Sequence, residues 1–257
     1  MKIAALFTDY DGTIAPARVR REDSAVPGPL LSVLSEISSR IPVAIITSKD
    51  LKFVRPRTTF AWAWATVLGL EVRLRDGGGH QANVSSDLHR VLDNVRYTLP
   101  SGTVVEEKRG TDGSLLGASL DWTSAPDPIG PGLIEAEKTF RAAGFQVNAY
   151  ADERYVDVYA VPANKVSAFN ELTRLLHIKG SVMYLGDSEN DNGVFEVCDL
   201  AICVDHSQRI EHLNCGLTVD YQELPGMLTK ILSDGLVVRN VPGKDPGRVK
   251  ETRASMR

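Results

Sequence analysis

The chain has 257 residues, of which 43% are hydrophobic and 24% charged, a composition that can bury one large hydrophobic core or two smaller ones. Its formal charge of −4 provides no chain-wide positive field, so nucleic acid and anionic membranes are not expected partners. No apolar run approaches the roughly 20 residues that span a bilayer. The three cysteines are too few for a disulfide framework. We therefore expect a globular, cytoplasmic protein.

The first part of the chain alternates strand and helix patterns. An apolar run over residues 2–8 predicts a buried parallel strand that ends at Asp9. Leucines and an isoleucine repeat at helical spacing over residues 30–37, and residues 42–48 form a second β-branched run. These segments predict a β-α-β unit. The glycine-rich stretch 76–80 predicts a loop or hinge after it.

The segment from residue 81 to residue 162 has a different rhythm. It predicts a helix, two strands, a second helix and two more strands, at residues 87–97, 103–108, 115–122, 133–143, 146–150 and 155–161. Adjacent strands without intervening helices imply an antiparallel sheet with helices on one face. We expect this αββαββ segment to be an inserted α+β domain.

Alternation of helices and strands resumes after the insertion. The predicted elements are helix 165–176, strand 181–186, helix 191–197, strand 199–204, a helix from Ser207, strand 217–221 and helix 224–233. The predicted fold class is therefore α/β, with a Rossmann-like parallel-sheet core from residues 1–80 and 163–238 around the insertion at 81–162. Residues 239–257 carry six Lys or Arg against two acids and predict a disordered tail.

Two carboxylates stand at the end of the first predicted strand, in the sequence DYDGT at residues 9–13. Side chains two apart on a strand share a face, so Asp9 and Asp11 can converge on one ligand, and Gly12 lets the chain turn away. Mg²⁺ prefers such oxygen ligands and commonly bridges carboxylates to substrate phosphate. A calcium-binding EF-hand loop does not fit, because the glycine comes too early and Arg20 stands where a bidentate Glu is required.

Three further blocks have matching chemistry. The sequence GDSENDN at 186–192 directly follows a predicted strand, Thr47 and Ser48 follow another, and Lys165 opens the helix after the insertion. Ligands of open α/β sheets bind beyond the carboxyl ends of the strands. Hydroxyl and backbone N–H groups there can hold phosphate oxygens, and an ammonium group can reach the same crevice.

Together the four blocks resemble the motifs of the haloacid dehalogenase-like superfamily: a strand with DxDGT, a strand ending in Ser or Thr, a Lys, and an acidic GDxxxD-type loop. The αββαββ insertion between the second and third motifs, with the GDxxND loop, resembles subgroup IIB with its C2-type cap. The segments GLE at 69–71, VRLRD at 72–76 and VVEEK at 104–108 are similar to trehalose-6-phosphate and sucrose-phosphate phosphatases.

The resemblance implies a Mg²⁺-dependent phosphomonoesterase that acts on a small phosphorylated sugar or polyol. Asp9 would be the nucleophile that forms an aspartyl phosphate, and Asp11 would serve as acid and then base. Phosphate contacts would come from Asp9, Thr47, Ser48 and Lys165. The metal would be held by Asp9, Asp11, Asp187 and Asp191, with Gly12 and Asn190 in supporting roles.

The chain departs from the family pattern at two places. Thr47-Ser48-Lys49 stands where the subgroup usually has Thr-Gly-Arg, and Leu68 stands where sugar phosphatases of this kind tend to have Asn or His. Within the insertion, Glu107 and Lys108 are the residues we expect to read the substrate, because a polyol pocket needs fixed donors and acceptors.

Three alternatives stay open at this point. The enzyme could act on another small acid, such as phosphoglycolate or mannosyl-3-phosphoglycerate, or it could be a phosphomutase that passes the phosphate back to a sugar. The third is a non-catalytic, receiver-like module that keeps an aspartyl phosphate as a signal, but such modules lack the second acid two residues after the nucleophile. The expected partner is a small phosphate ester, and the sequence leaves the oligomeric state open.

Overall fold

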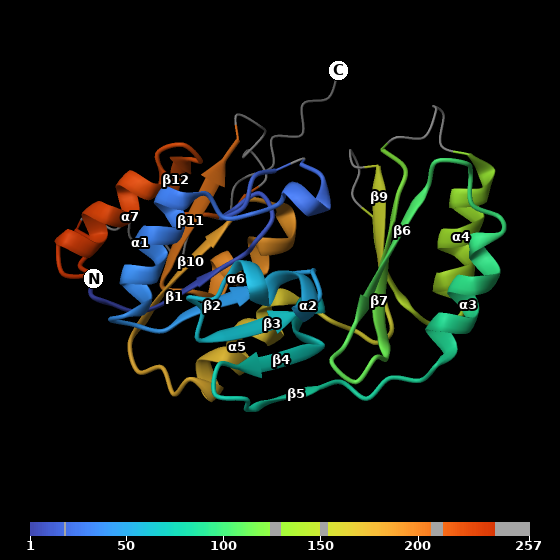
Figure 1. Cartoon of the computed structure of the whole chain (residues 1–257), viewed down its shortest axis with the longest axis horizontal. Helices are drawn as coiled ribbons and strands as arrows, with labels where there is room; N and C mark the ends of the chain where they lie inside the picture. The colour runs from blue at the N-terminus through green and yellow to red at the C-terminus, as the bar shows by residue number, and fades with distance from the viewer. Residues whose placement is uncertain (18, 124–129, 150–153, 207–212, 240–257) are drawn as a thin grey trace, which may run out of the picture.

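The computed structural model describes residues 1–17, 19–123, 130–149, 154–206 and 213–239. Within these residues the strands form two sheets, one of eight strands and one of four. Figure 1 shows the two sheets in two lobes, with the segment between α3 and β9 forming the right-hand lobe. The predictions of a helix from Ser207 and of a disordered tail fall almost entirely on residues 207–212 and 240–257, outside the described part of the chain.

The larger sheet is built around β1 (Ile3–Thr8) and has the order β12-β11-β10-β1-β2-β3-β4-β5. Its other strands are β2 (Val43–Ile46), β3 (Ala63–Thr66), β4 (Glu71–Leu74), β5 (Gly79–Gln81), β10 (Ser181–Gly186), β11 (Leu200–Asp205) and β12 (Leu217–Asp220). All pairs from β12 to β3 are parallel, whereas β4 and β5 pair antiparallel. The predicted α/β class is thus confirmed. Because β1 and β10 are neighbours, the loops that follow them meet at one edge of the sheet.

The glycine-rich stretch 76–80 lies in a hairpin: residues 76–78 form the predicted loop, whereas Gly79 and His80 already belong to strand β5. The N–H of Gly78 donates to Asp76 Oδ1 at 3.0 Å, which closes the turn, and the chain returns as edge strand β5 beside β4. Gly79 has a φ of 131°, and a Cβ there would lie 2.1 Å from the Val72 carbonyl oxygen. The glycines therefore permit a close antiparallel approach.

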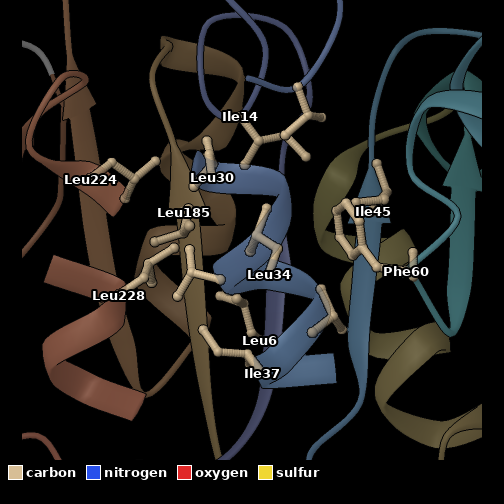
Figure 2. Close-up of a cluster of buried hydrophobic side chains, with 14 of the residues drawn as sticks. Leu6, Ile14, Leu30, Leu34, Ile37, Ile45, Phe60, Leu185, Leu224 and Leu228 are labelled. Atoms are coloured by element: carbon tan, nitrogen blue, oxygen red, sulfur yellow. The ribbon is translucent and has the colours of Figure 1, made fainter. Parts of the chain in front are cut away.

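Helices cover both faces of the larger sheet. Helices α1 (Gly28–Ser38) and α7 (Leu224–Ser233) pack on one face, and α5 (Lys165–Leu175) and α6 (Asn192–Val197) pack on the other. Successive side chains of β1 point to opposite faces of the sheet. Leu6 packs in the cluster with α1 and α7, whereas the residues on either side of it pack in the cluster with α5. Figure 2 shows the first cluster. No helix among the described residues is long and apolar enough to cross a membrane.

The smaller sheet lies between its own helices and the larger lobe (Figure 1). Its order is β6-β7-β9-β8, and every pair in it is antiparallel. The elements are α3 (Asp87–Arg96), β6 (Val104–Arg109), β7 (Leu115–Asp121), α4 (Pro131–Ala142), β8 (Gln146–Ala149) and β9 (Tyr155–Tyr159). Leu92, Leu120 and Phe140 are among the side chains buried between sheet and helices. The predicted αββαββ order is confirmed.

The structure pairs two of the three cysteines. Cys203 on β11 and Cys215 before β12 form a disulfide with a Cα–Cα distance of 5.8 Å, and Cys198 is free and buried. The count and spacing of the cysteines did not indicate this bridge, which depends on β11 and β12 being parallel neighbours.

Candidate active site

The ends of β1 and β10 bring three carboxyl groups together. Asp9 follows β1, Asp187 follows β10, and Asp191 ends the short 3-10 turn Glu189–Asp191. One oxygen from each of these carboxylates lies within 4.8 Å of the others. Lys165 Nζ lies 2.6 Å from Asp9 Oδ2 and 2.7 Å from Asp191 Oδ1. Residues on both sides of the insertion therefore meet in one charged cluster.

Lys165 is fixed at the start of α5. The preceding residue, Asn164, caps the helix by accepting the N–H of Ser167 at 2.8 Å, and the Lys165 side chain is only 1% exposed. Burial alone would lower the pKa of Lys165, but the charges of Asp191 and Asp9 raise it above its ordinary value. The site thus contains a permanent positive charge.

Asp9 is oriented through both of its carboxylate oxygens. Oδ1 accepts the N–H of Tyr10 at 2.6 Å, and Oδ2 accepts from Lys165. Burial raises the pKa of Asp9 to about 7, although the nearby ammonium opposes the shift. The carboxylate is therefore held in place while carrying a charge that its surroundings only partly neutralise.

Asp187 adds further negative charge beside Asp9. Its Oδ1 accepts the Thr13 hydroxyl at 2.8 Å, and its Oδ2 lies 2.1 Å from where a Cβ on Gly12 would stand. Desolvation raises the pKa of Asp187 well above its ordinary value, and the charge of Asp9 adds to this shift. Three clustered carboxylates around one ammonium group supply several oxygen ligands and an excess of negative charge, which suits Mg²⁺. The residues present therefore fit that ion.

Asp191 has an orienting position. Its Oδ1 accepts from Lys165 and, at 2.5 Å, from the hydroxyl of Tyr184. Its Oδ2 accepts the N–H groups of Asp187 and Ser188, both at 3.2 Å. Asp191 therefore holds the ammonium group and the acidic loop together. Sequence reasoning missed Tyr184, since an aromatic residue in an apolar strand carries no sign of a polar role.

Asp11 lies outside the cluster of three carboxylates. Its Oδ1 accepts the Ser24 hydroxyl at 3.1 Å, its Oδ2 lies 3.6 Å from Lys49 Nζ, and the side chain is 39% exposed. Burial alone would lower the pKa of Lys49, but Asp11 and Glu106 raise it. Asp11 is thus accessible from the region between the two lobes.

The other predicted residues border this region. Thr47, at the end of β2, is buried, and its hydroxyl oxygen accepts the N–H of Lys49 at 3.1 Å. Ser48 is half-buried beside it. Asn190 has a buried Oδ1 atom without a hydrogen-bond partner among the described residues, so this oxygen is free to accept from a water or a ligand.

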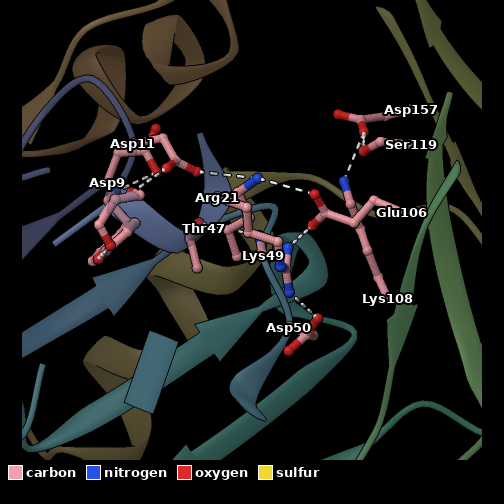
Figure 3. A network of polar contacts seen from close by, with 12 residues as sticks. Asp9, Asp11, Arg21, Thr47, Lys49, Asp50, Glu106, Lys108, Ser119 and Asp157 are labelled. Carbon is pink, nitrogen blue, oxygen red and sulfur yellow. Dashed lines mark hydrogen bonds and ion pairs between the residues drawn. The ribbon is translucent and has the colours of Figure 1, made fainter. Parts of the chain in front are cut away.

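Glu106 and Lys108 on strand β6 of the smaller sheet lie opposite Arg21, Thr47 and Lys49 of the larger lobe (Figure 3). Glu106 forms an ion pair with Arg21 and lies 3.4 Å from Lys49 Nζ. Lys108, two residues on, shares that strand face and lies buried with its Nζ 2.6 Å from Asp157 Oδ1. Glu107 points to the other face.

Glu107 forms ion pairs with Arg96 and Arg109, both outside the region between the lobes. The predicted substrate contact Glu107 therefore points away from the region between the lobes, whereas its neighbour Glu106 points into it. The alternation of side chains along β6 could have shown that Lys108 shares a face with Glu106 and not with Glu107.

Part of the chain is similar in sequence to known proteins. A family model described as haloacid dehalogenase-like hydrolase matches residues 133–222. A trehalose-phosphate phosphatase of Mycobacterium bovis is 32% identical over 114 residues, 41% of this chain and 29% of that protein. The chain therefore spans less than a third of the length of that curated relative.

Solved structures extend the likeness over the whole fold. A trehalose-6-phosphate phosphatase related protein, 21% identical, aligns over 90% of this chain and 98% of its own with a TM-score of 0.71. Residues 133–222 thus resemble haloacid dehalogenase-like hydrolases in sequence, and the chain shares its fold with this solved structure. A sugar phosphatase of subclass IIB, 13% identical, covers 91% of this chain and 100% of its own with a TM-score of 0.64. Both alignments span the larger sheet and the insertion between β5 and α5, so the likeness in fold extends over both lobes.

Proposed function

We propose that the protein is a phosphomonoesterase that hydrolyses a phosphorylated sugar at Asp9. The observation that carries this proposal is the convergence of Asp9, Lys165 and Asp187 at the sheet edge that faces the insertion. Asp9, Asp187 and the backbone carbonyl of Asp11 would hold Mg²⁺, with Asp191 close by. When bound, the ion supplies positive charge that offsets the repulsion between a carboxylate and a phosphate.

In the first step a carboxylate oxygen of Asp9 attacks phosphorus, and the bond from phosphorus to the ester oxygen breaks. The Lys165 ammonium group and the Thr47 hydroxyl hold phosphate oxygens in place. Asp11, in its protonated form, gives its proton to the departing alcohol oxygen. The product is a phosphorylated Asp9 and a free sugar hydroxyl.

In the second step water replaces the alcohol. Asp11, now ionised, takes a proton from the water as its oxygen attacks phosphorus. The bond between phosphorus and Asp9 breaks, which releases inorganic phosphate and restores both carboxyl groups to their initial states. The exposure of Asp11 toward the space between the lobes supports this exchange of alcohol for water.

The insertion at 81–162 is the cap in this proposal, and the rest of the described chain is the core. Glu106 and Lys108 would contact sugar hydroxyls, because both stand on the strand face that meets Arg21 and Lys49. Asp157 holds Lys108 at a fixed position, which suits recognition of a rigid polyol. Relatives described as trehalose-phosphate phosphatases make a phosphorylated disaccharide the first substrate to test.

The test measures phosphate release from trehalose 6-phosphate, other sugar phosphates, phosphoglycolate and p-nitrophenyl phosphate, with Mg²⁺ or with EDTA. We expect Mg²⁺-dependent turnover that falls by about a thousandfold or more in Asp9→Asn, because the nucleophile is lost. Asp93→Asn, on the exposed face of α3, is the matched control.

The proposal is wrong if no phosphate ester in this panel is hydrolysed in the presence of Mg²⁺, or if Asp9→Asn keeps full activity. Transfer of labelled phosphate to a second sugar hydroxyl would indicate a phosphomutase, and a persistent aspartyl phosphate would indicate a signalling module. The cytoplasmic location stays a prediction, which fractionation of cells that express a tagged chain tests.

A further inference from the structure

Arg21 contacts both lobes at once. It opens the 3-10 turn Arg21–Asp23 in the connection between β1 and α1. One terminal nitrogen lies 2.9 Å from Asp50 Oδ2, and the other is paired with Glu106 on β6. The guanidinium carbon also lies 4.2 Å from the centre of the Phe53 ring. A single side chain therefore bridges the core and the insertion.

On the core side of this bridge, Asp50 and Phe53 hold Arg21 and are themselves hydrogen-bonded to each other. Asp50 Oδ1 accepts the N–H of Phe53 at 2.8 Å, which caps the short helix α2 (Leu51–Val54) and fixes the carboxylate that holds Arg21. The Phe53 ring supports the guanidinium plane from one side. Arg21 is thus aimed at β6 by two core residues that are themselves held together.

The insertion side presents one carboxylate to this bridge. Glu106 lies between Arg21 and Lys49 and is 20% exposed. Neighbouring charges on the insertion are satisfied elsewhere, since Lys108 pairs with Asp157 and Glu107 pairs with arginines on the other strand face. Glu106 is therefore the acidic group through which β6 is attached to the core cations.

We propose that Arg21 is a positioning residue. By pairing with the Glu106 carboxylate, it seats the insertion on the core, that is, it holds the two lobes together beside the candidate active site. Arginine suits this role because its planar fork can serve Asp50 and Glu106 at the same time. Lys49 contributes charge but also pairs with Asp11, so it belongs to the catalytic surroundings. The seating of the insertion rests on geometry alone, and its effect on sugar selectivity rests on the proposed function.

A double-mutant cycle measured by small-angle X-ray scattering tests the seating without any substrate. The variants are Arg21→Met, Glu106→Gln and the pair, with Arg40→Met as control because Arg40 is exposed and pairs only with Glu36 among the described residues. We expect each single change to increase the radius of gyration and the double change to resemble Glu106→Gln alone, because Glu106→Gln removes the pairs with both Arg21 and Lys49 whereas Arg21→Met removes only the first. High salt should expand the wild-type protein toward the variants.

An unchanged radius of gyration in Arg21→Met and Arg21→Glu would overturn the proposal, as would fully additive effects in the cycle. Arg21→Lys, which keeps the charge but not the fork, should be intermediate. Thermal melting shows that each variant is folded before scattering is recorded.

Kinetics test the consequence for selectivity. We expect Arg21→Met to lower the ratio of kcat/KM for the sugar phosphate to that for p-nitrophenyl phosphate by about three- to fivefold, mainly through KM, and 1 M salt to lower the wild-type ratio in the same way. In the Glu106→Gln background the Arg21 change should have no further effect. An equal loss on both substrates would contradict the proposed role in selectivity. Scattering needs no turnover, so the two proposals can fail separately. If the wild-type protein has no phosphatase activity but Arg21→Met still increases the radius of gyration, the proposed function is refuted and the seating is not.

Discussion

The hydroxyl of Tyr184 gives the clearest residue-scale view of how the site is held. It shares Asp191 Oδ1 with the Lys165 ammonium group, so one oxygen orients two groups. The motifs predicted Asp9, Lys165 and Asp191 because charged residues at strand and helix ends stand out in the sequence. They could not predict Tyr184, because the sequence of a buried strand does not show whether a tyrosine hydroxyl contacts a site residue or has a purely structural hydrogen bond.

Tyr184→Phe removes this hydrogen bond and leaves the ring in place. We expect kcat for the preferred phosphate ester to fall about tenfold with little change in KM, because Lys165 loses part of its orientation and not its charge. Tyr97→Phe is the control, since Tyr97 is 91% exposed. Steady-state kinetics that showed kcat within twofold of wild type would contradict the orienting role.

Protons and Mg²⁺ should compete for Asp9. Burial raises its pKa to about 7 in the metal-free protein, so between about pH 4 and pH 7 the folded state holds a proton that the unfolded state has lost. This stabilisation is present at low pH and is lost as the pH rises through about 7. Because Mg²⁺ binds the ionised carboxylate, we expect it to raise Tm more at about pH 8 than at about pH 5.5.

Calorimetry at the two pH values, with and without Mg²⁺, checks this expectation. Asp9→Asn should respond to Mg²⁺ less than wild type does and with a weaker dependence on pH. An equal Mg²⁺ effect at both pH values in the wild-type protein would argue against binding at Asp9.

At the scale of elements, β6 shows both the strength and the limit of reading a pattern. Adjacent strands without helices between them correctly predicted the antiparallel sheet, since the order of strand and helix patterns along the chain depends only on local residues. The face that each residue of β6 presents depends on its register with β7, where Glu106 stands opposite Ser119 and Glu107 opposite Ala118. Alternation along β6 groups Glu106 with Lys108, but which of the two strand faces meets the core depends on how the sheet packs, and that required the structure.

The buried pair on β6 and β9 should be necessary for the stability of the insertion. Asp157→Asn removes the negative charge and leaves the Lys108 ammonium group buried without its partner. We therefore expect the free energy of unfolding, measured in urea at pH 7, to fall by about 3 to 5 kcal/mol. Replacing both members, as in Lys108→Met with Asp157→Leu, should restore much of this loss. Asp93→Asn, on the exposed side of α3, should have little effect.

The same pair should make stability depend on pH at the acidic end. Burial would raise the pKa of Asp157, but the Lys108 charge and hydrogen bonds lower it below its ordinary value. The group therefore stabilises the fold above about pH 4, and this contribution is lost as the pH falls through the folded-state pKa. Urea unfolding at about pH 7 and about pH 3 should show a larger wild-type advantage over Asp157→Asn at the higher pH.

At the scale of the whole molecule, the lobes are joined by a second contact remote from Arg21. The carboxylate of Glu71 on β4 is fully buried and accepts the hydroxyl and the N–H of Thr111 from the turn between β6 and β7. Gln81 on β5 also donates to Ser114 in that turn. The edge strands that follow β3 thus serve as a platform for the insertion, which the glycine-rich sequence at 76–80 did not reveal.

Thr111→Val should weaken this attachment. The change removes one of three partners of Glu71 Oε1, the others being the Thr111 N–H and Arg73, and keeps the shape of the side chain, so we expect a loss of about 1 to 2 kcal/mol in the free energy of unfolding. Thr229→Val on α7 is the control, since its hydroxyl only returns to the helix backbone. Equal stability of the two variants in urea would show that the contact contributes little.

The order of the larger sheet also determines when each lobe can fold during synthesis. The smaller sheet uses strands only from residues 104–159, so all its partners have been made before β10 is reached. The first strand, Ile3–Thr8, can pair early with β2 on one side, but its other side pairs with Ser181–Gly186 and must wait for this partner, which is made late in translation. We expect the insertion to be the first structured part of the nascent chain, with the apolar strand β1 in need of protection from aggregation until β10 emerges.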